Sequence, residues 1–243
     1  MTSMLEGLEL EGLVIRMELL PALLLRAEEE AIAQLVPCDQ AWLAEARQQW
    51  LANRDLEQEL SQRRWQAADL DLHLWRPEAL LRFARQRYGP GLEERFLADK
   101  QARDQVVYSL LRVTDAGLAR ELWIRIEEGE TSFTEAIAQF SQGPEALHKG
   151  VIGPVAIGAL QPPQLGEWLR QLRPGDVRPP QMLGEWHVML RLEQLTSARF
   201  DDAMRQVLLQ ESLHAFLQAR VQQRLAGDTP EPLHFEPSEQ VSP

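Results

Sequence analysis

Few residues in this chain have the type and spacing that catalysis or metal binding requires. Its five histidines are scattered without the short spacings of zinc ligands. They are His73, His148, His187, His214 and His234. The single cysteine, Cys38, excludes an internal disulfide and a thiolate-rich metal site. Ser109 has no evident base that would activate it as a nucleophile. We therefore expect no metal and no cofactor, so any chemistry must come from the shape and polarity of a binding site.

Length and charge narrow the function classes. The chain has 243 residues, with 25 Lys and Arg against 37 Asp and Glu, which gives a formal net charge of -12. Such a chain repels nucleic-acid phosphates and anionic membrane surfaces, so we expect neither as a partner. The length fits one large domain or two small ones.

The first residues differ from a secretory signal. Glu6, Glu9 and Glu11 precede the first basic residue, Arg16, whereas a signal begins with a basic segment. The most apolar run, at 19–25, is interrupted by proline and is shorter than the roughly 20 residues that span a bilayer. We expect a cytoplasmic protein without membrane insertion.

Residues 1–104 have the pattern of a helical module. Pro21 suits the first turn of a helix, and Asp39 can cap the next one. Further helices are predicted at 56–65, 79–87 and 92–103.

A long helix is predicted again near the end of the chain, from Asp201 to Leu225. Its apolar face needs a partner, and the N-terminal helices are the simplest one. The four prolines of the tail at 227–243 favour disorder.

Between these helical zones, the pattern changes to short strands. Residues 106–111 are apolar, β-branched and aromatic, which favours a strand. Thr114 or Asp115 can cap a following helix, and Ser132 with Glu135 forms a capping box for another. A Gly- and Pro-rich segment at 141–163 comes next.

The rest of this zone predicts a short helix, a turn and a strand. The helix lies at 165–172, and Pro179-Pro180 predicts a rigid turn. From Trp186 onward, apolar residues recur at every second position, which predicts a strand with one buried face.

Four motifs in residues 105–196 resemble those of the parvulin-type (PpiC) peptidyl-prolyl isomerase domain. FTEAIAQFSQGP at 133–144 resembles the family's F-x-E-x-A-x-x-x-S-x-x-P. Lys149-Gly150 with Gly153 resembles its Gly-Gly-x-x-Gly loop. LRPGDV at 172–177 is similar to L-K-P-G-E-V, and GEWH at 184–187 resembles the G-Y-H of the last strand.

The flanking helices resemble those of SurA/PrsA-type folding factors. This resemblance implies an α+β fold with a mainly helical N-terminal module at 1–104. A parvulin-like domain with a small antiparallel sheet would be inserted at 105–196. The helix at 197–226 would pack on the N-terminal module, and the disordered tail would occupy 227–243.

The resemblance also implies positions for the site. The family's histidine on the first strand corresponds to Ser109, and its Cys or Asp in the loop to Val151. The family's Met and Phe correspond to Gln161 and Leu165.

The last-strand histidine corresponds to Trp186, or to His187 if one extra residue is allowed. Alternation favours Trp186 on the apolar face, with His187 pointing the other way. Ile152 and Trp168 complete the predicted peptide-binding residues.

Rotation about an X–Pro bond takes tens to hundreds of seconds unassisted. Its catalysis needs an apolar cradle and polar groups that stabilise the twisted imide, but no cofactor. The resemblance implies a folding factor that binds extended, proline-containing or unfolded polypeptide. The substitutions at the family's site positions predict weak or absent isomerase activity.

Two alternatives stay open. The first is a non-catalytic chaperone that uses the parvulin fold to bind peptides, and the second is a helical adaptor. Protein-export machinery is a further expected partner, and the sequence leaves the oligomeric state open.

Overall fold

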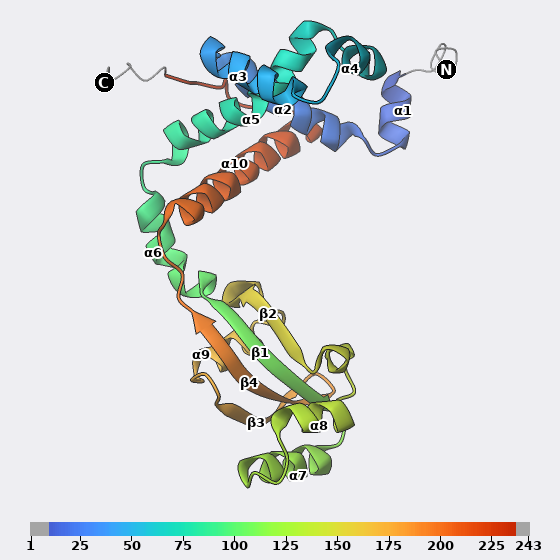
Figure 1. Cartoon of the computed structure of the whole chain (residues 1–243), viewed down its shortest axis with the longest axis vertical. Helices are drawn as coiled ribbons and strands as arrows, with labels where there is room; N and C mark the ends of the chain where they lie inside the picture. Colours follow the sequence, from blue (N-terminus) through green and yellow to red (C-terminus); the bar gives the residue numbers. More distant parts are fainter. Residues whose placement is uncertain (1–9, 237–243) are drawn as a thin grey trace. The chain divides into compact units, whose positions relative to one another are not determined.

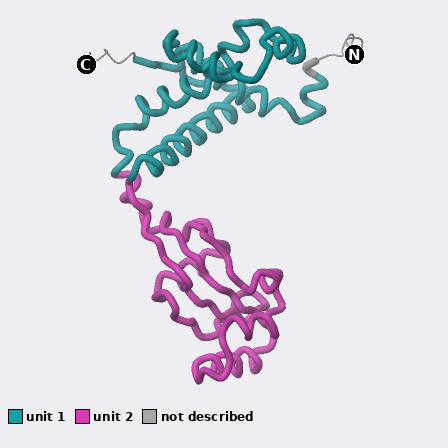
Figure 2. Tube along the Cα trace, in the orientation of Figure 1, with its two compact units in different colours: residues 1–93, 201–243 teal, residues 94–200 magenta. Residues whose placement is uncertain are grey.

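The computed structural model describes residues 10–236, which form two compact units (Figures 1 and 2). Unit 1 joins the chain up to Glu93 to the chain from Asp201 onward, and unit 2 is Glu94–Phe200. Unit 2 therefore extends outside the predicted boundaries at 105 and 196. Among the described residues, no helix combines the length and apolar character needed to cross a membrane.

Unit 1 is helical. Its helices are α1 (Leu10–Arg16), α2 (Leu20–Leu35), α3 (Gln40–Leu51), α4 (Leu56–Arg63), α5 (Ala67–Tyr88) and α10 (Asp202–Leu225). Helix α6 (Leu92–Arg103) crosses the boundary between the units. Helices α2, α5 and α10 contact one another. They share a buried cluster, called cluster 1 below, of Ile32, Ala33, Val36, Trp75, Ala79, Phe83 and Leu217.

Helix α5 begins earlier than the helix predicted at 79–87, because it continues through Pro77. A proline inside a helix removes one hydrogen bond and costs about 3 kcal/mol. Trp75 and Ala79, on either side of it, are buried in cluster 1. The Trp75 indole also donates to the Ala33 carbonyl oxygen at 3.2 Å. These tertiary contacts offset the cost of Pro77 inside the helix. They involve residues distant in the sequence, so the local sequence pattern did not predict them.

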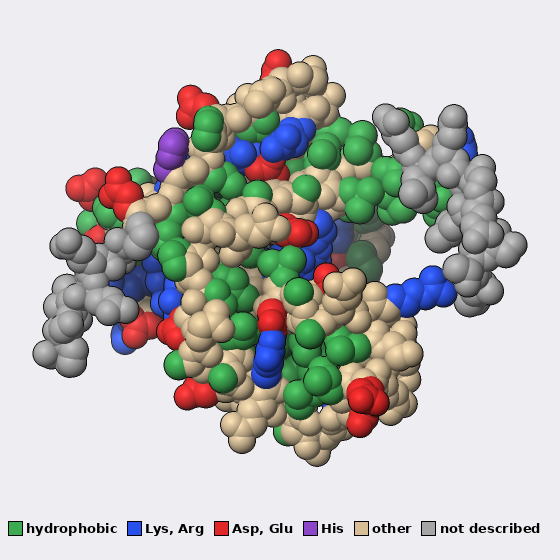
Figure 3. All heavy atoms as spheres, turned by 90° about the horizontal axis from the view of Figure 1, so that it is seen from above, with side chains coloured by type: hydrophobic (Ala, Val, Ile, Leu, Met, Phe, Trp, Pro, Cys, Tyr) green, Lys and Arg blue, Asp and Glu red, His purple; other side chains and the backbone are tan. Residues whose placement is uncertain are grey.

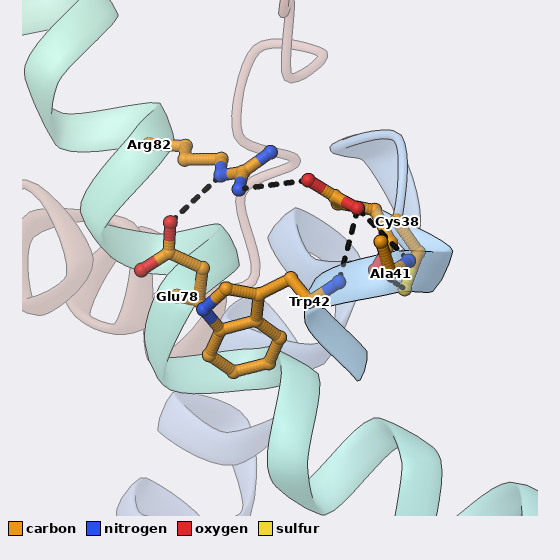
Figure 4. Close-up of polar contacts among 6 residues, drawn as sticks. Cys38, Ala41, Trp42, Glu78 and Arg82 are labelled. Atoms are coloured by element: carbon orange, nitrogen blue, oxygen red, sulfur yellow. Dashed lines mark hydrogen bonds and ion pairs between the residues drawn. The ribbon is translucent and has the colours of Figure 1, made fainter. Parts of the chain in front are cut away.

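Asp39 caps α3, as the sequence predicted (Figure 4). Its carboxylate accepts from the amides of Ala41 and Trp42 at 3.0 and 3.1 Å. Arg82 of α5 donates to Glu78 and approaches Asp39 at 3.7 Å. The Trp42 ring packs edge-on against Trp75 with 5.5 Å between centroids. Polar and aromatic contacts together therefore hold α3 on α5.

Unit 2 contains a four-stranded antiparallel sheet with the order β2-β1-β4-β3 (Figure 1). The strands are β1 (Gln105–Val113), β2 (Val151–Ala156), β3 (Val177–Leu183) and β4 (Trp186–Thr196). Helices α7 (Ala116–Glu127), α8 (Phe133–Phe140) and α9 (Gln164–Arg170) accompany it, with short 3-10 turns η2 (Pro144–His148) and η3 (Ile157–Ala159). The α+β prediction is confirmed.

Strand β3 differs from the sequence prediction. We expected Pro179-Pro180 to form a rigid turn, but both prolines lie within β3. Because β3 is an edge strand, a residue there can lack the amide that an inner ladder needs. The pairing with β4 also shifts between Arg178 and Gln181, where the prolines stand.

The sheet is buried on both faces. On the α9 face, Leu165 and Leu169 of α9 pack against apolar side chains of β1 and β4. On the α8 face, α7 and α8 pack against Leu111, Val113 and Met189. A strand with two buried faces has no polar side to reveal its orientation.

The tail is a second difference from the sequence prediction. We expected disorder from 227 onward, but residues 228–236 lie against unit 1. Leu233 and Phe235 pack on cluster 1, which supplies the burial that composition alone did not indicate. The remainder of the predicted tail, 237–243, lies outside the described residues.

Candidate functional site

The α9 face of the sheet brings together three of the residues predicted to bind peptide and Trp186, which was predicted at the position of the last-strand histidine. Leu165 is buried in its core, and Ile152, Trp168 and Trp186 pack around it, partly exposed. They come from β2, α9 and β4, so the sheet and the short helix assemble an apolar and aromatic surface.

Trp186 lies on this face together with Val188, Leu190 and Leu192. The alternation in β4 predicted this placement. His187 has the opposite orientation, because neighbouring residues of a strand point to opposite faces. It pairs with Val113 of β1 and Met182 of β3. The side chain on the candidate site is therefore the indole and not the imidazole.

Ser109, which we placed at the position of the first-strand histidine, does not face this site. It is buried, and its hydroxyl donates to Glu193 at 2.5 Å. Arg191 donates to the same carboxylate oxygen of Glu193 and lies 5.4 Å from the Phe133 ring of α8. These contacts place Ser109 on the α8 face.

The neighbour of Ser109, Tyr108, faces the candidate site. It pairs with Ile152 of β2 and Leu192 of β4 and is only 4% exposed. Burial, and then the nearby charge of Glu145, raises the pKa of the Tyr108 phenol. Tyr108 is therefore a neutral, polar group beneath the apolar surface. Sequence reasoning missed it because both faces of β1 are apolar.

An ion pair between β1 and η2 lies beside Trp186. Arg112 donates to Glu145 through Nε at 2.8 Å and through Nη2 to the second carboxylate oxygen. The Arg112 guanidinium lies 5.5 Å from the Trp186 ring centroid, within reach of a cation–π interaction. Gly143 makes room for this pair, since a Cβ there would lie 2.1 Å from Arg112 Nε.

Burial by itself would raise the pKa of Glu145, whose side chain is 5% exposed. The hydrogen bonds and charge of Arg112 outweigh burial and hold the Glu145 pKa below its ordinary value. The same pairing raises the pKa of Arg112. Both groups are thus charged at neutral pH and already engaged with each other. Only the spacing of Arg112 in β1, on the same face as Tyr108, could have suggested this pair from sequence.

A second arginine covers the other tryptophan. Arg178 of β3 lies 5.3 Å from the Trp168 ring centroid and donates to Gln171 at 2.8 Å. Each indole of the site therefore has one guanidinium against it. This arrangement suits flat, apolar or carbonyl-rich ligands better than it suits cations.

The remaining predicted residues lie at the margin. Val151 pairs with Ser109 and is 47% exposed, and Gln161 is exposed ahead of α9. Within residues 10–236, no group of three or more His, Cys, Asp or Glu side chains is placed to hold a metal ion.

Comparison with known proteins supports the fold. Neither a family model nor a curated protein matches the sequence. Among solved structures, the peptidyl-prolyl isomerase PrsA from Bacillus cereus is similar with a TM-score of 0.51 and 12% identity. The similarity covers 96% of this chain and 88% of that one. The chain has the PrsA fold.

Two further structures are similar over most of their length. PrsA from Bacillus anthracis has a TM-score of 0.46 and 16% identity, covering 84% of this chain and 96% of that one. A SurA-like chaperone from Campylobacter jejuni has a TM-score of 0.38 and 16% identity, covering 79% and 80%. The PrsA fold was predicted from the motifs in residues 105–196 and the flanking helices, and that prediction is confirmed.

Proposed function

We propose that this protein is a folding factor that binds extended, proline-containing polypeptide on the α9 face of unit 2. The observation that carries the proposal is the surface of Ile152, Leu165, Trp168 and Trp186 on a PrsA fold. Aromatic and aliphatic side chains around a buried floor suit a proline ring or another apolar side chain.

We propose further that isomerase activity is weak or absent. Catalysis requires polar groups that stabilise the twisted imide better than the planar one. Tyr108 is buried beneath the surface, and Arg112 is held by Glu145. A histidine on the first strand would have to replace a side chain of β1 on this face, namely Val106, Tyr108, Leu110 or Arg112. The burial of Tyr108 and the pairing of Arg112 with Glu145 support a site that binds peptide with little catalysis.

A non-catalytic chaperone is the second candidate, and unit 1 supplies an observation in its favour. The segment at 15–23 carries five large apolar side chains that are 36–59% exposed. They are Ile15, Met17, Leu19, Leu20 and Leu23. Clustered, exposed apolar side chains commonly mark a surface that binds other polypeptides.

The test compares Trp186→Ala with His187→Ala in the full chain. NMR titration with the peptide Ala-Ala-Pro-Phe is expected to show binding in the wild type and in His187→Ala. Trp186→Ala should weaken binding by about tenfold, since an aromatic anchor contributes about 1.4 kcal/mol or more. Cis–trans exchange in the same samples should be accelerated little or not at all.

The outcomes separate the candidate functions. A strong acceleration that Trp186→Ala abolishes would show that the site is catalytic. If no peptide binds, suppression of aggregation of a reduced, unfolded protein decides between the chaperone and the adaptor. If the protein neither binds peptide nor suppresses aggregation, the folding-factor proposal is contradicted.

We also propose a cytoplasmic location, with clients held before export. The formal charge of -12 favours basic or neutral unfolded clients through long-range attraction. Cell fractionation and co-purification test this proposal. Recovery of the protein outside the cytoplasm would contradict it.

A further inference from the structure

The chain after α10 forms an extended strap, residues 228–236. Gly227 ends α10 with a φ of +87°, and the Asp228 amide donates back to the Gln223 carbonyl oxygen at 2.9 Å. These are the features of a Schellman motif, which satisfies the last carbonyls of a helix and redirects the chain. The strap then continues without helix or strand in unit 1 (Figure 1).

From Leu233 to Glu236 the strap alternates between partly buried and exposed side chains. Leu233 and Phe235 pack against cluster 1, formed by α2, α5 and α10. His234, between them, is exposed, as is Glu236. Two inward side chains separated by one outward residue are what an extended peptide offers to a groove.

Unit 1 holds the main chain of the strap at two places. Arg220 donates from Nη1 to the Glu231 carbonyl oxygen at 2.6 Å. The Gln86 amide group accepts from the Glu236 amide at 3.1 Å and donates to the Glu236 carbonyl oxygen. Gln86 therefore contacts both backbone polar groups of one residue, Glu236, as a residue of a neighbouring antiparallel β-strand would. Such contacts are available from any residue type except, at the Glu236 position, proline, because they involve only the backbone of the strap.

The first of these anchors is fixed by a buried ion pair. Arg220 donates from Nε to Glu28 of α2 at 2.5 Å, and Arg224 donates to the other carboxylate oxygen. Glu28 is 1% exposed and the Arg220 side chain 9% exposed. Burial alone would raise the pKa of Glu28, but both arginines together lower it. Arg220 is thus held in place independently of the strap.

We infer that the strap occupies a second polypeptide-binding site, in unit 1, and acts as its intramolecular ligand. The site takes an extended segment with apolar residues two positions apart. Arg220 donates to the carbonyl oxygen of the residue two positions before the first of them. Gln86 contacts the backbone N–H and C=O of the residue after the second. The inference rests on the proposed function in one respect: the segment that competes with the strap is taken to come from an unfolded client. Its location in unit 1 makes it separable from the α9 face.

Tethering sets the strength of competition. A short linker gives a tethered segment an effective concentration of about millimolar, which an external peptide must exceed. The wild type should therefore bind added peptide weakly at this site, and opening the strap should strengthen that binding by tenfold or more.

The experiment uses the full chain and a fluorescein-labelled peptide with the sequence of residues 228–236. The opened variant carries Leu233→Ser and Phe235→Ser, and its matched control carries His234→Ser, at the exposed position between them. Fluorescence anisotropy should give a Kd at least tenfold lower for the opened variant than for the wild type and His234→Ser. Adding Gln86→Ala to the opened variant should raise the Kd at least fivefold. A peptide with serine in place of both apolar residues should not compete.

A second form of the chain covers the case in which the opened variant does not fold. A protease site inserted after Gly227 allows the strap to be cut without any change in cluster 1. The cut chain should exchange its strap for labelled peptide, whereas the uncut chain should not. An intact helical signal with no saturable binding in either form would overturn the inference and leave the strap a part of the core. Trp186→Ala in the opened chain should not change the Kd of the labelled peptide. Loss of peptide binding in that variant would contradict the location of the site in unit 1.

Discussion

At the residue scale, the decisive difference from a parvulin-like active site lies in two adjacent side chains of β1. Tyr108 faces the α9 side and Ser109 the α8 side. One position along a strand exchanges the two faces. The resemblance assigned the family's first-strand histidine to Ser109, whereas the neighbouring Tyr108 packs in the core of the α9 face. The side chain on the candidate site is consequently a phenol instead of the hydroxyl that we predicted.

The Arg112–Glu145 pair allows a prediction at the same scale. Glu145→Gln leaves the Arg112 charge without its partner in a mostly buried place, which should lower the free energy of unfolding of unit 2 by about 3 kcal/mol. Urea unfolding at neutral pH, followed by Trp fluorescence, measures the change. Glu167→Gln, at an exposed position of α9, is the control and should behave as the wild type.

The same variant predicts a change in pH dependence. In the folded protein the pKa of Glu145 lies below its ordinary value of 4.5. The charged form therefore contributes stability above that value, and the contribution is lost as the pH falls through the lowered pKa. Stability of the wild type should fall more steeply than that of Glu145→Gln between about pH 5 and 3. Parallel curves would contradict the role of the ion pair.

At the element scale, Gly150 joins η2 to β2 where α8 packs on the sheet. It has a φ of +74°, and a Cβ there would lie 2.5 Å from Ile137 Cδ1 and 2.8 Å from the Leu110 carbonyl oxygen. Gly129 has a φ of +73° but nothing within 4 Å of such a Cβ. The two glycines share the backbone requirement and differ in their surroundings.

This pair gives a matched prediction. Alanine at either position costs about 1–2 kcal/mol for the left-handed conformation. Gly150→Ala should cost about 2 kcal/mol more than Gly129→Ala, because it also overpacks the contact between α8 and the sheet. Thermal unfolding of both variants measures the difference. Equal losses would show that Ile137 moves aside without cost.

At the scale of the whole molecule, unit 2 is an insertion whose two ends lie together. Phe96 stacks on Phe200 with 5.4 Å between ring centroids, and Asp104 accepts from the Ala198 amide at 2.8 Å. Both hydrophobic clusters of the sheet are built from residues of unit 2.

Acidic and basic side chains lie among apolar ones on the face seen in Figure 3.

We therefore predict that residues 94–200 fold alone. The isolated unit should show dispersed NMR signals and a cooperative thermal transition, because its core and its closing contacts are internal. The complementary chain, with Glu93 linked to Asp201 through a short Gly-Ser linker, should retain its helical signal. A molten unit 2 without cooperative melting would show that its core depends on unit 1.

Much of the local structure could be read from the sequence. Asp39 and Ser132 cap helices as predicted, since a capping side chain acts within three residues of its own position. Of the two candidates predicted for α7, Thr114 and Asp115, it is Asp115 that caps the helix. The alternation in β4 placed Trp186 correctly, because that strand has one uniformly apolar face. These capping roles and the face of Trp186 could be predicted without information from distant parts of the chain.

Tertiary structure alone decided the features that depend on distant partners. Helix α5 continues through Pro77, β3 contains Pro179 and Pro180, and the strap packs on cluster 1. In each case burial or an edge position offsets a local preference. β1 carries apolar residues on both sides, so only packing against α8 and α9 determined which face bears Tyr108 and Arg112. The sequence by itself determined the kinds of elements and their order, through local hydrogen bonding and periodicity, while long-range packing decided which side chains form the site.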